Sequence, residues 1–169
     1  MTAVLLVEGA SDKAAIETLA RRRGRDLAAE GAEVVAIGGA QAVGRVLASI
    51  AGRRCVGLCD AREEQGFRRA FERAGVTPIV HACNPDLEGE LIRALGAEAV
   101  EAVLGANGDL GSFRTMQKQP EWRRRPGEDQ LRRFLASGAR RKIRYAVLLV
   151  DALELDRMPA PLDGALAEI

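Results

Sequence analysis

The sequence predicts an α/β fold in which helices flank a mostly parallel four-stranded sheet, with a C-terminal helical extension. Three observations support this class. Short apolar runs rich in Val, Leu and Ile end at a glycine or an acidic residue, as buried parallel strands do. Amphipathic stretches of roughly 10–15 residues separate these runs, which is typical of right-handed crossovers. After Gly105 the alternation stops, and segments rich in Gly and Arg follow.

The elements are expected in a regular order. The first strand, 4–7, ends at Gly9, and Ser11 or Asp12 is available to cap the next helix. The predicted elements are strands 4–7, 33–37, 55–59 and 76–81, and helices 12–23, 41–50, 63–74, 86–95, 128–136 and 140–154. In the last helix, Ile143, Ala146, Val147 and Val150 make the expected apolar face, opposite Arg140 and Arg144.

Length and composition fit one folded unit with a small appendage. The chain has 169 residues, of which 47% are hydrophobic and 29% charged, enough for a proper core and against disorder. We expect an α/β core over 1–105 and a basic loop with a helical extension over 106–169. No apolar stretch is long enough for a membrane span, and no signal-peptide pattern is present. With three cysteines in apolar segments, these features predict a cytoplasmic protein.

The net charge of +1 conceals an uneven distribution. Residues 112–144 carry eleven basic residues against three acids, whereas residues 145–169 carry one arginine and five acids. This asymmetry predicts a surface for a polyanion such as nucleic acid. Trp122 lies among these charges and could stack on an unpaired base, but we expect it to fill the core. The predicted nucleic-acid contacts are Arg114, Lys118, Arg123, Arg124, Arg125, Arg140 and Arg144.

Acidic residues follow three of the predicted strands. Glu8 and Asp12 follow the first, Asp60 ends the third, and Asp86 and Glu88 follow the fourth. Each one alone is explained as a helix cap or a first-turn acid. Together, at one edge of a parallel sheet, they would repel one another unless a cation neutralised them. The pattern therefore predicts one or two Mg²⁺ (or Mn²⁺) ions bound with substrate phosphate.

These motifs resemble a known family. Val7-Glu8-Gly9 with Asp12, followed by Asp60 at the end of a later strand, resembles the TOPRIM domain of topoisomerases, bacterial primases and several nucleases. Segments 85–96 and 138–146 are similar to parts of overcoming-lysogenization-defect (OLD) nucleases and their stand-alone TOPRIM relatives. The resemblance implies a Rossmann-like TOPRIM fold and Mg²⁺-dependent hydrolysis of phosphodiester bonds in nucleic acid, with DNA favoured over RNA.

The resemblance also implies roles for individual residues. Glu8 would be a metal ligand or the general acid/base, and Asp12, Asp60 and Glu88 would complete the metal sites, with Asp86 a weaker candidate. Lys142, with Arg141, would neutralise charge that develops on the phosphate. One departure stands out, because Arg62 occupies the place of the family's second acid after the third strand. Glu63 or Glu64 lies within one helical turn of Asp60 and is available to replace it.

Two functional classes follow from this reading. The first is a metal-dependent endonuclease, and the second is a catalytically degenerate TOPRIM module that binds nucleic acid or a partner without cleavage. Arg62 favours the second class, and the retained acids favour the first. OLD nucleases join this domain to an ATPase, which this sequence lacks, so an ATPase partner in trans is a further hypothesis.

Two other motifs are expected to be structural. The segment 39–45 has glycine spacing like that of a P-loop but lacks its Lys and Ser/Thr, so a turn into a helix is expected. Cys59, His81 and Cys83 lack the paired spacing of a zinc site, and a structural role is expected for His81.

Overall fold

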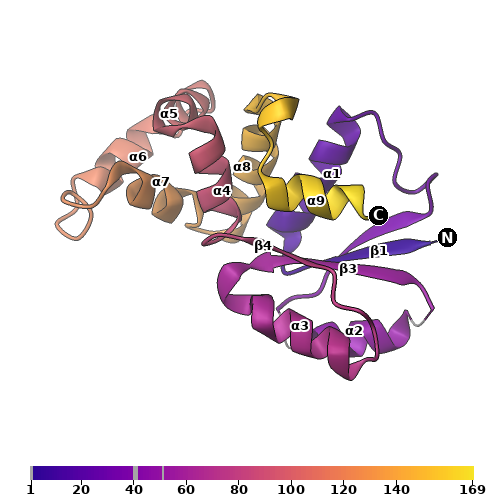
Figure 1. Ribbon diagram of the computed structural model, residues 1–169. Coiled ribbons are helices and arrows are strands. Elements are labelled where there is room, and N and C mark those ends of the chain that lie inside the picture. The colour runs from indigo at the N-terminus through magenta and orange to yellow at the C-terminus, as the bar shows by residue number, and fades with distance from the viewer. Residues whose placement is uncertain (1, 40–41, 51) are drawn as a thin grey trace.

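One parallel sheet organises the chain, which a computed structural model describes over residues 2–39, 42–50 and 52–169 (Figure 1). The sheet contains β1 (Ala3–Val7), β2 (Ala32–Ala36), β3 (Arg54–Asp60) and β4 (Val80–Cys83), in the order β2-β1-β3-β4. Each pairing between neighbours is parallel. The predicted α/β class and the parallel sheet are therefore confirmed.

Helices connect and flank these strands. Within the described residues they are α1 (Ala10–Arg22), α2 (Val43–Ser49), α3 (Glu64–Arg73), α4 (Leu87–Leu95), α5 (Ala97–Ala106), α6 (Leu110–Gln117), α7 (Gly127–Leu135), α8 (Ala139–Ala152) and α9 (Ala160–Ala167). Two 3-10 turns, Ala61–Glu63 and Leu155–Arg157, complete the order. None of the helices in the described residues is both long enough and apolar enough to span a membrane.

The sheet separates two apolar cores, which explains why β1 is apolar at every position. Leu5 and Val7 of β1 point to the core that contains α1, α4, α8 and α9. Val4 and Leu6 point to the opposite core, which contains α2 and α3. Figure 1 shows α2 and α3 below the sheet and the other helices above it or beside it. A strand buried on both faces reads as a continuous hydrophobic run.

The C-terminal helices are tied closely to α1 and the sheet. Helix α8 packs along α1, and α9 returns to β3 and β4. The guanidinium of Arg22 donates hydrogen bonds to the carbonyl oxygens of Val150 at 2.5 Å and Leu153 at 2.6 Å. One core contains Leu58 of the sheet together with Leu149 of α8. The boundary between 1–105 and 106–169 stays a prediction.

Several element boundaries differ from the sequence-based expectation. Helix α1 begins at Ala10 with Gly9 as its N-cap, so neither Ser11 nor Asp12 is the N-cap residue, but the Asp12 side chain caps the helix from its third position by accepting from the Gly9 N–H. Strand β4 begins at Val80 rather than at residue 76, because Pro78 has no N–H to donate to a neighbouring strand. Part of the predicted helix 41–50 and of the glycine-spaced segment lies outside the described residues, and the described part of that helix is α2.

The helices α5, α6 and α9 were missed by the sequence analysis. Gly105 and Gly111 lower the helix propensity of the first two segments, and burial of Leu104 and Phe113 overrides that preference. The apolar face of α8 was predicted only in part, since Ala146 and Val150 are buried as expected, whereas Ile143 is 36% exposed and the buried Tyr145 and Leu149 were missed. The expectation that Trp122 fills the core was wrong, because its side chain is half-buried at the surface.

Candidate active site

The parallel strands bring three acidic junctions to one edge of the sheet. Glu8 directly follows β1, Asp60 is the last residue of β3, and α4 begins a few residues after β4. The carboxylate of Glu8 accepts a hydrogen bond from the backbone N–H of Asp60 at 2.8 Å. This bond joins the ends of two adjacent strands and orients Glu8 across the edge.

Asp12 is placed by the first turn of α1. It is the third residue after the Gly9 N-cap, and its Oδ2 accepts a hydrogen bond from the Gly9 N–H at 3.1 Å. The side chain therefore satisfies one of the free N–H groups near the helix start. Only 5% of Asp12 is exposed, so the carboxylate is almost withdrawn from water.

Glu88 lies in the first turn of α4 and is equally buried, at 4% exposed. Within the described residues, neither of its carboxylate oxygens has a hydrogen-bond partner. Its nearest counter-charge is Lys142 of α8, whose Nζ lies 3.5 Å from Oε1 of Glu88. A buried carboxylate without hydrogen bonds is costly, so the cation beside it is essential to its environment.

A surface pocket of about 260 Å³ collects most of these groups. Glu8, Asp12, Asp60 and Lys142 line it together with Arg62, the residue that departs from the family pattern. The segment from Gly9 to Ser11 and residues Ala139 and Ile143 complete its wall. Glu88 is not part of the lining, and its connection to the pocket is the ion pair with Lys142.

Burial and mutual repulsion shift the proton affinities of the cluster. Burial is the largest cause in each case, and it raises the pKa of Glu8, Asp60 and Glu88. Burial also raises the pKa of Asp12 to about 7, with further contributions from neighbouring carboxylates that include Asp60 and Glu88. Burial disfavours the Lys142 ammonium, but the surrounding carboxylates outweigh it and raise the pKa of that lysine. A cation bound in the pocket would relieve this repulsion.

The donor set fits a hard divalent cation in its chemistry, although the carboxylates line one pocket without converging on a single point. The side chains offer oxygen atoms, and the Glu88 oxygens have no other partner among the described residues. In the described ranges, however, no three His, Cys, Asp or Glu side chains are close enough together to hold a metal ion. Binding would therefore require small side-chain movements or oxygens from substrate and water.

Three other residues expected at the site are placed elsewhere. Asp86 is the N-cap of α4, where its Oδ1 accepts from the Gly89 N–H at 2.9 Å, and its Oδ2 pairs with Arg132 at 2.6 Å. Glu64 pairs with Arg68 one turn along α3, at 2.8 Å. Arg141 points to the α6–α7 side, where it donates to Ser137 Oγ, lies over the Phe134 ring and approaches Asp109.

The predicted nucleic-acid residues divide into paired and unpaired groups. Arg114 pairs with Glu101, and Arg144 pairs with Asp109 and donates to Asn107. In the part of the chain that the structure describes, the others form no ion pair and are exposed: Lys118, Arg123, Arg124, Arg125 and Arg140. Of these, Arg123, Arg124 and Arg125 share the turn that precedes α7.

The sequence analysis missed one neighbour of the site. Arg132 neutralises Asp86, and no local signal on α7 indicates that contact. His81 packs its ring against Gly164 of α9, where a methyl group would come within 2.6 Å of it, in keeping with the expected structural role. Cys59 and Cys83 are free and buried.

Comparison with known proteins agrees with this architecture. Residues 1–61 match the family model described as "Overcoming lysogenization defect protein-like, TOPRIM domain". The C-terminal region of the Burkholderia pseudomallei OLD protein has a similar fold, with a TM-score of 0.69, 17% identity, and coverage of 98% of this chain and 95% of that chain. The C-terminal region of the Xanthomonas campestris pv. campestris OLD protein is also similar, with a TM-score of 0.68, 22% identity, and coverage of 98% of this chain and 92% of that chain. A search of curated proteins gave no match. The chain therefore has the fold of the C-terminal region of OLD proteins, and its first 61 residues match their TOPRIM domain, which confirms the resemblance inferred from the sequence.

Proposed function

We propose that this chain is a divalent-metal-dependent endonuclease that hydrolyses phosphodiester bonds in nucleic acid, with DNA favoured over RNA. The observation that carries the proposal is the gathering of Glu8, Asp12 and Asp60 around Lys142 in one pocket, with Glu88 behind it. Burial and mutual repulsion raise the pKa values of these acids, that of Asp12 to about 7, so a bound cation would favour their ionised forms. A surface that only displays charge has no reason to bury them.

In this proposal Glu8, Asp12 and Asp60 hold Mg²⁺ or Mn²⁺, and Glu88 joins them or supports them through Lys142. Carboxylate-bound divalent ions stabilise the attacking and leaving oxygens of an in-line displacement at phosphorus. Asp86 and Glu64 are not included, because arginines already neutralise them.

The remaining polar residues of the pocket act on the phosphate. The Lys142 ammonium faces the pocket and would neutralise charge on the non-bridging oxygens. The Arg62 side chain is 80% exposed beside it, lies 3.6 Å from Glu63 in an exposed ion pair, and would exchange that partner for a neighbouring phosphate. Glu8 is half-buried and lines the same pocket, and in this proposal its carboxylate accepts or returns a proton at the scissile bond. Arg141 is assigned a packing role instead.

A non-cleaving module is the second candidate. Two observations favour it: Arg62 occupies the pocket, and the described acids do not reach a three-ligand cluster. In this alternative the pocket binds a nucleic-acid phosphate through Lys142 and Arg62, and the cleaving or energy-consuming step belongs to a partner such as an ATPase supplied in trans.

Cleavage assays distinguish the two candidates. Supercoiled plasmid and single-stranded DNA and RNA are incubated with Mg²⁺ or Mn²⁺, using the wild type, Glu8→Gln and Glu17→Gln. Glu17 is an exposed glutamate of α1 that lies outside the pocket, so it is a matched control. We expect the wild type and Glu17→Gln to cut DNA and Glu8→Gln to lose at least about a hundredfold in rate. Cutting by Glu8→Gln at the wild-type rate would refute the assignment.

Metal binding is measured separately from activity. Calorimetric titration with Mn²⁺ at pH 7.5 should show binding to the wild type. The Mn²⁺ affinity should fall by about tenfold or more in Asp60→Asn, and should not change in Asp151→Asn on the exposed side of α8. Equal binding by the two variants would place the ion elsewhere. Nucleic-acid binding without metal binding or cleavage would establish the second candidate.

A further inference from the structure

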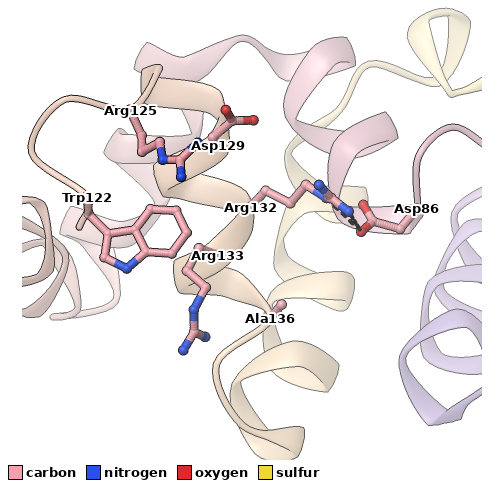
Figure 2. A pocket seen from close by; sticks show the side chains of 7 residues that line it. All are labelled: Asp86, Trp122, Arg125, Asp129, Arg132, Arg133 and Ala136. Carbon is pink, nitrogen blue, oxygen red and sulfur yellow. Dashed lines mark hydrogen bonds and ion pairs between the residues drawn. The ribbon is translucent and has the colours of Figure 1, made fainter.

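A second hollow lies beside the carboxylate pocket, between the turn that precedes α7 and the start of α4 (Figure 2). It has a volume of about 450 Å³. Its lining contains an aromatic ring and several guanidinium groups, and consists of Asp86, Trp122, Arg125, Asp129, Arg132, Arg133 and Ala136. The proposed function does not use this hollow.

The backbone of Trp122 is anchored although its ring is not buried. The Trp122 carbonyl accepts a hydrogen bond from Gln130 Nε2 at 2.7 Å, and Gln130 Oε1 accepts from Gln117 Nε2 at 2.6 Å. Gln130 is only 6% exposed, so a buried amide pair holds the turn in place. The indole itself remains half-buried and lines the hollow. An aromatic ring on an anchored backbone can bind a planar ligand with a smaller loss of conformational entropy than a ring on a mobile loop.

The charges around the ring favour an anion. Figure 2 shows Arg125 and Arg133 on either side of Trp122, and neither forms an ion pair within the described residues. The Arg133 guanidinium carbon is 6.0 Å from the centre of the indole ring, which is the outer limit of a cation–π contact. Asp86 is neutralised by Arg132, which leaves Asp129 as the acid that opposes these arginines.

The hollow also lies near the carboxylate pocket. Asp86 lines the hollow and lies in the same turn as Glu88. Asp86 is close enough to Asp60 for their charges to interact, and Asp60 lines the carboxylate pocket. A ligand with charges spaced along a chain, such as a polynucleotide strand, could therefore occupy both places at once.

We propose that this hollow binds an unpaired nucleotide of a single strand, with the base stacked on the Trp122 ring and the adjoining phosphates held by Arg125 and Arg133. Stacking on an aromatic side chain requires a base free of its own neighbours, whereas the bases inside a duplex are already stacked. The substrate class is therefore nucleic acid with a single-stranded segment. The inference rests on the proposed function only in identifying the bound strand as the one that is cut.

Trp122 is the single tryptophan of the chain, so its fluorescence reports on the hollow directly. The full chain is titrated without divalent metal, so that no cutting occurs, with an oligothymidylate of about ten nucleotides. The comparison ligands are an abasic oligomer of equal length, a blunt duplex and a poly-glutamate peptide. We expect strong quenching by the oligothymidylate alone. Equal quenching by the abasic oligomer or the peptide would show that charge, and not a base, is recognised, and would overturn the proposal, as would no quenching at all.

Variants then test the individual side chains by anisotropy of a labelled oligothymidylate. Trp122→Ala should weaken binding by about tenfold, and Trp122→Phe by much less because phenylalanine also stacks. Arg125→Ala and Arg133→Ala should each weaken it several-fold, whereas Arg45→Ala, an exposed arginine on α2 across the sheet, should not. An equal loss in Arg45→Ala would overturn the proposal.

The two proposals fail in different ways. Glu8→Gln should bind the oligothymidylate as tightly as the wild type, because Glu8 lies outside the hollow. Quenching without any cleavage would reject only the nuclease function. If the wild type and Trp122→Ala cleave single-stranded substrates at the same rate, and the oligothymidylate causes no quenching, only the unpaired-nucleotide site is rejected.

Discussion

The Nζ atom of Lys142 lies 3.5 Å from Oε1 of Glu88, and this pair connects α8 to the first turn of α4. The Glu88 side chain is 6% exposed and that of Lys142 is 35% exposed. Lys142 is therefore the protein's own counter-charge for an otherwise unsatisfied carboxylate, and it also faces the pocket. Lys142 therefore contributes both to the stability of the fold, through Glu88, and to the charge of the pocket.

Replacing Lys142 should therefore destabilise the protein. We expect Lys142→Met to lower the free energy of unfolding by about 1–3 kcal/mol at pH 8, less than for a fully buried pair because Lys142 is partly exposed. The loss should shrink at pH 5, where Glu88 can take up a proton instead. Urea denaturation at the two pH values measures it.

The matched control for this change is Lys118→Met, which removes an exposed lysine. Its stability should stay within about 0.5 kcal/mol of the wild type. If Lys142→Met were as stable as Lys118→Met at both pH values, the 3.5 Å pair would have no energetic importance.

Asp12 should make the metal-free protein less stable as the pH rises. Its pKa is about 7 in the folded protein, above the ordinary value of 3.8, so the folded state keeps a proton that the unfolded chain releases. The resulting stabilisation is complete below about pH 4 and is lost as the pH rises through 7, with a slope of up to about 1.4 kcal/mol per pH unit. Asp12→Asn should flatten this dependence while keeping an acceptor for the Gly9 N–H.

Unfolding free energies measured in chelator between pH 4 and 8 provide the comparison. Asp151→Asn changes an exposed aspartate of α8 and should reproduce the wild-type slope. Glu8, Asp60 and Glu88 shift in the same direction, so some slope remains in Asp12→Asn. A slope that is identical in the wild type and Asp12→Asn would contradict the raised pKa.

Asp86 should prove to be structural rather than a metal ligand. Asp86→Asn keeps an oxygen for the Gly89 N–H but loses the charge pair with Arg132, whereas Asp86→Ala loses both. We expect Asp86→Ala to cost about 1–2 kcal/mol of stability and Asp86→Asn less. Calorimetric Mn²⁺ affinity of Asp86→Asn should stay within about threefold of the wild type. Loss of Mn²⁺ binding in a folded Asp86→Asn variant would show that Asp86 is a metal ligand after all.

Gly89 should be required for the placement of Glu88. A methyl group at Gly89 would come within 2.7 Å of Pro85 Cδ and 3.3 Å of the Asp86 carboxylate, so the first turn of α4 would have to move. Gly89→Ala should therefore destabilise the protein by about 1–3 kcal/mol, although alanine normally favours a helix.

Gly111 of α6 supplies the comparison, because a methyl group there has nothing within 4 Å. Gly111→Ala should leave the midpoint of thermal unfolding unchanged or raise it. A stabilising effect of Gly89→Ala would mean that the turn carrying Glu88 adapts without cost.

The parallel sheet was predictable because its cause is local. A strand buried on both faces must be apolar at every position, and β1 and β3 carry that signature in consecutive residues. The acids that follow those strands were equally visible, and a parallel sheet places their carboxyl ends at one edge. The short, glycine-containing helices α5 and α6 were not predictable in this way, since packing of residues such as Phe113 overrides their weak propensity.

The sequence alone was enough to identify the parallel α/β core and the acids Glu8, Asp12 and Asp60 at its edge, because period, glycine and charge are properties of neighbouring residues. Which cations meet those acids depends on contacts between segments far apart in the chain. Lys142 and Arg141 are adjacent in α8, yet a helix turns by about 100° per residue, so one faces the pocket and the other packs on Phe134. In the same way Arg132 neutralises Asp86, and Trp122 lines a surface hollow instead of the core.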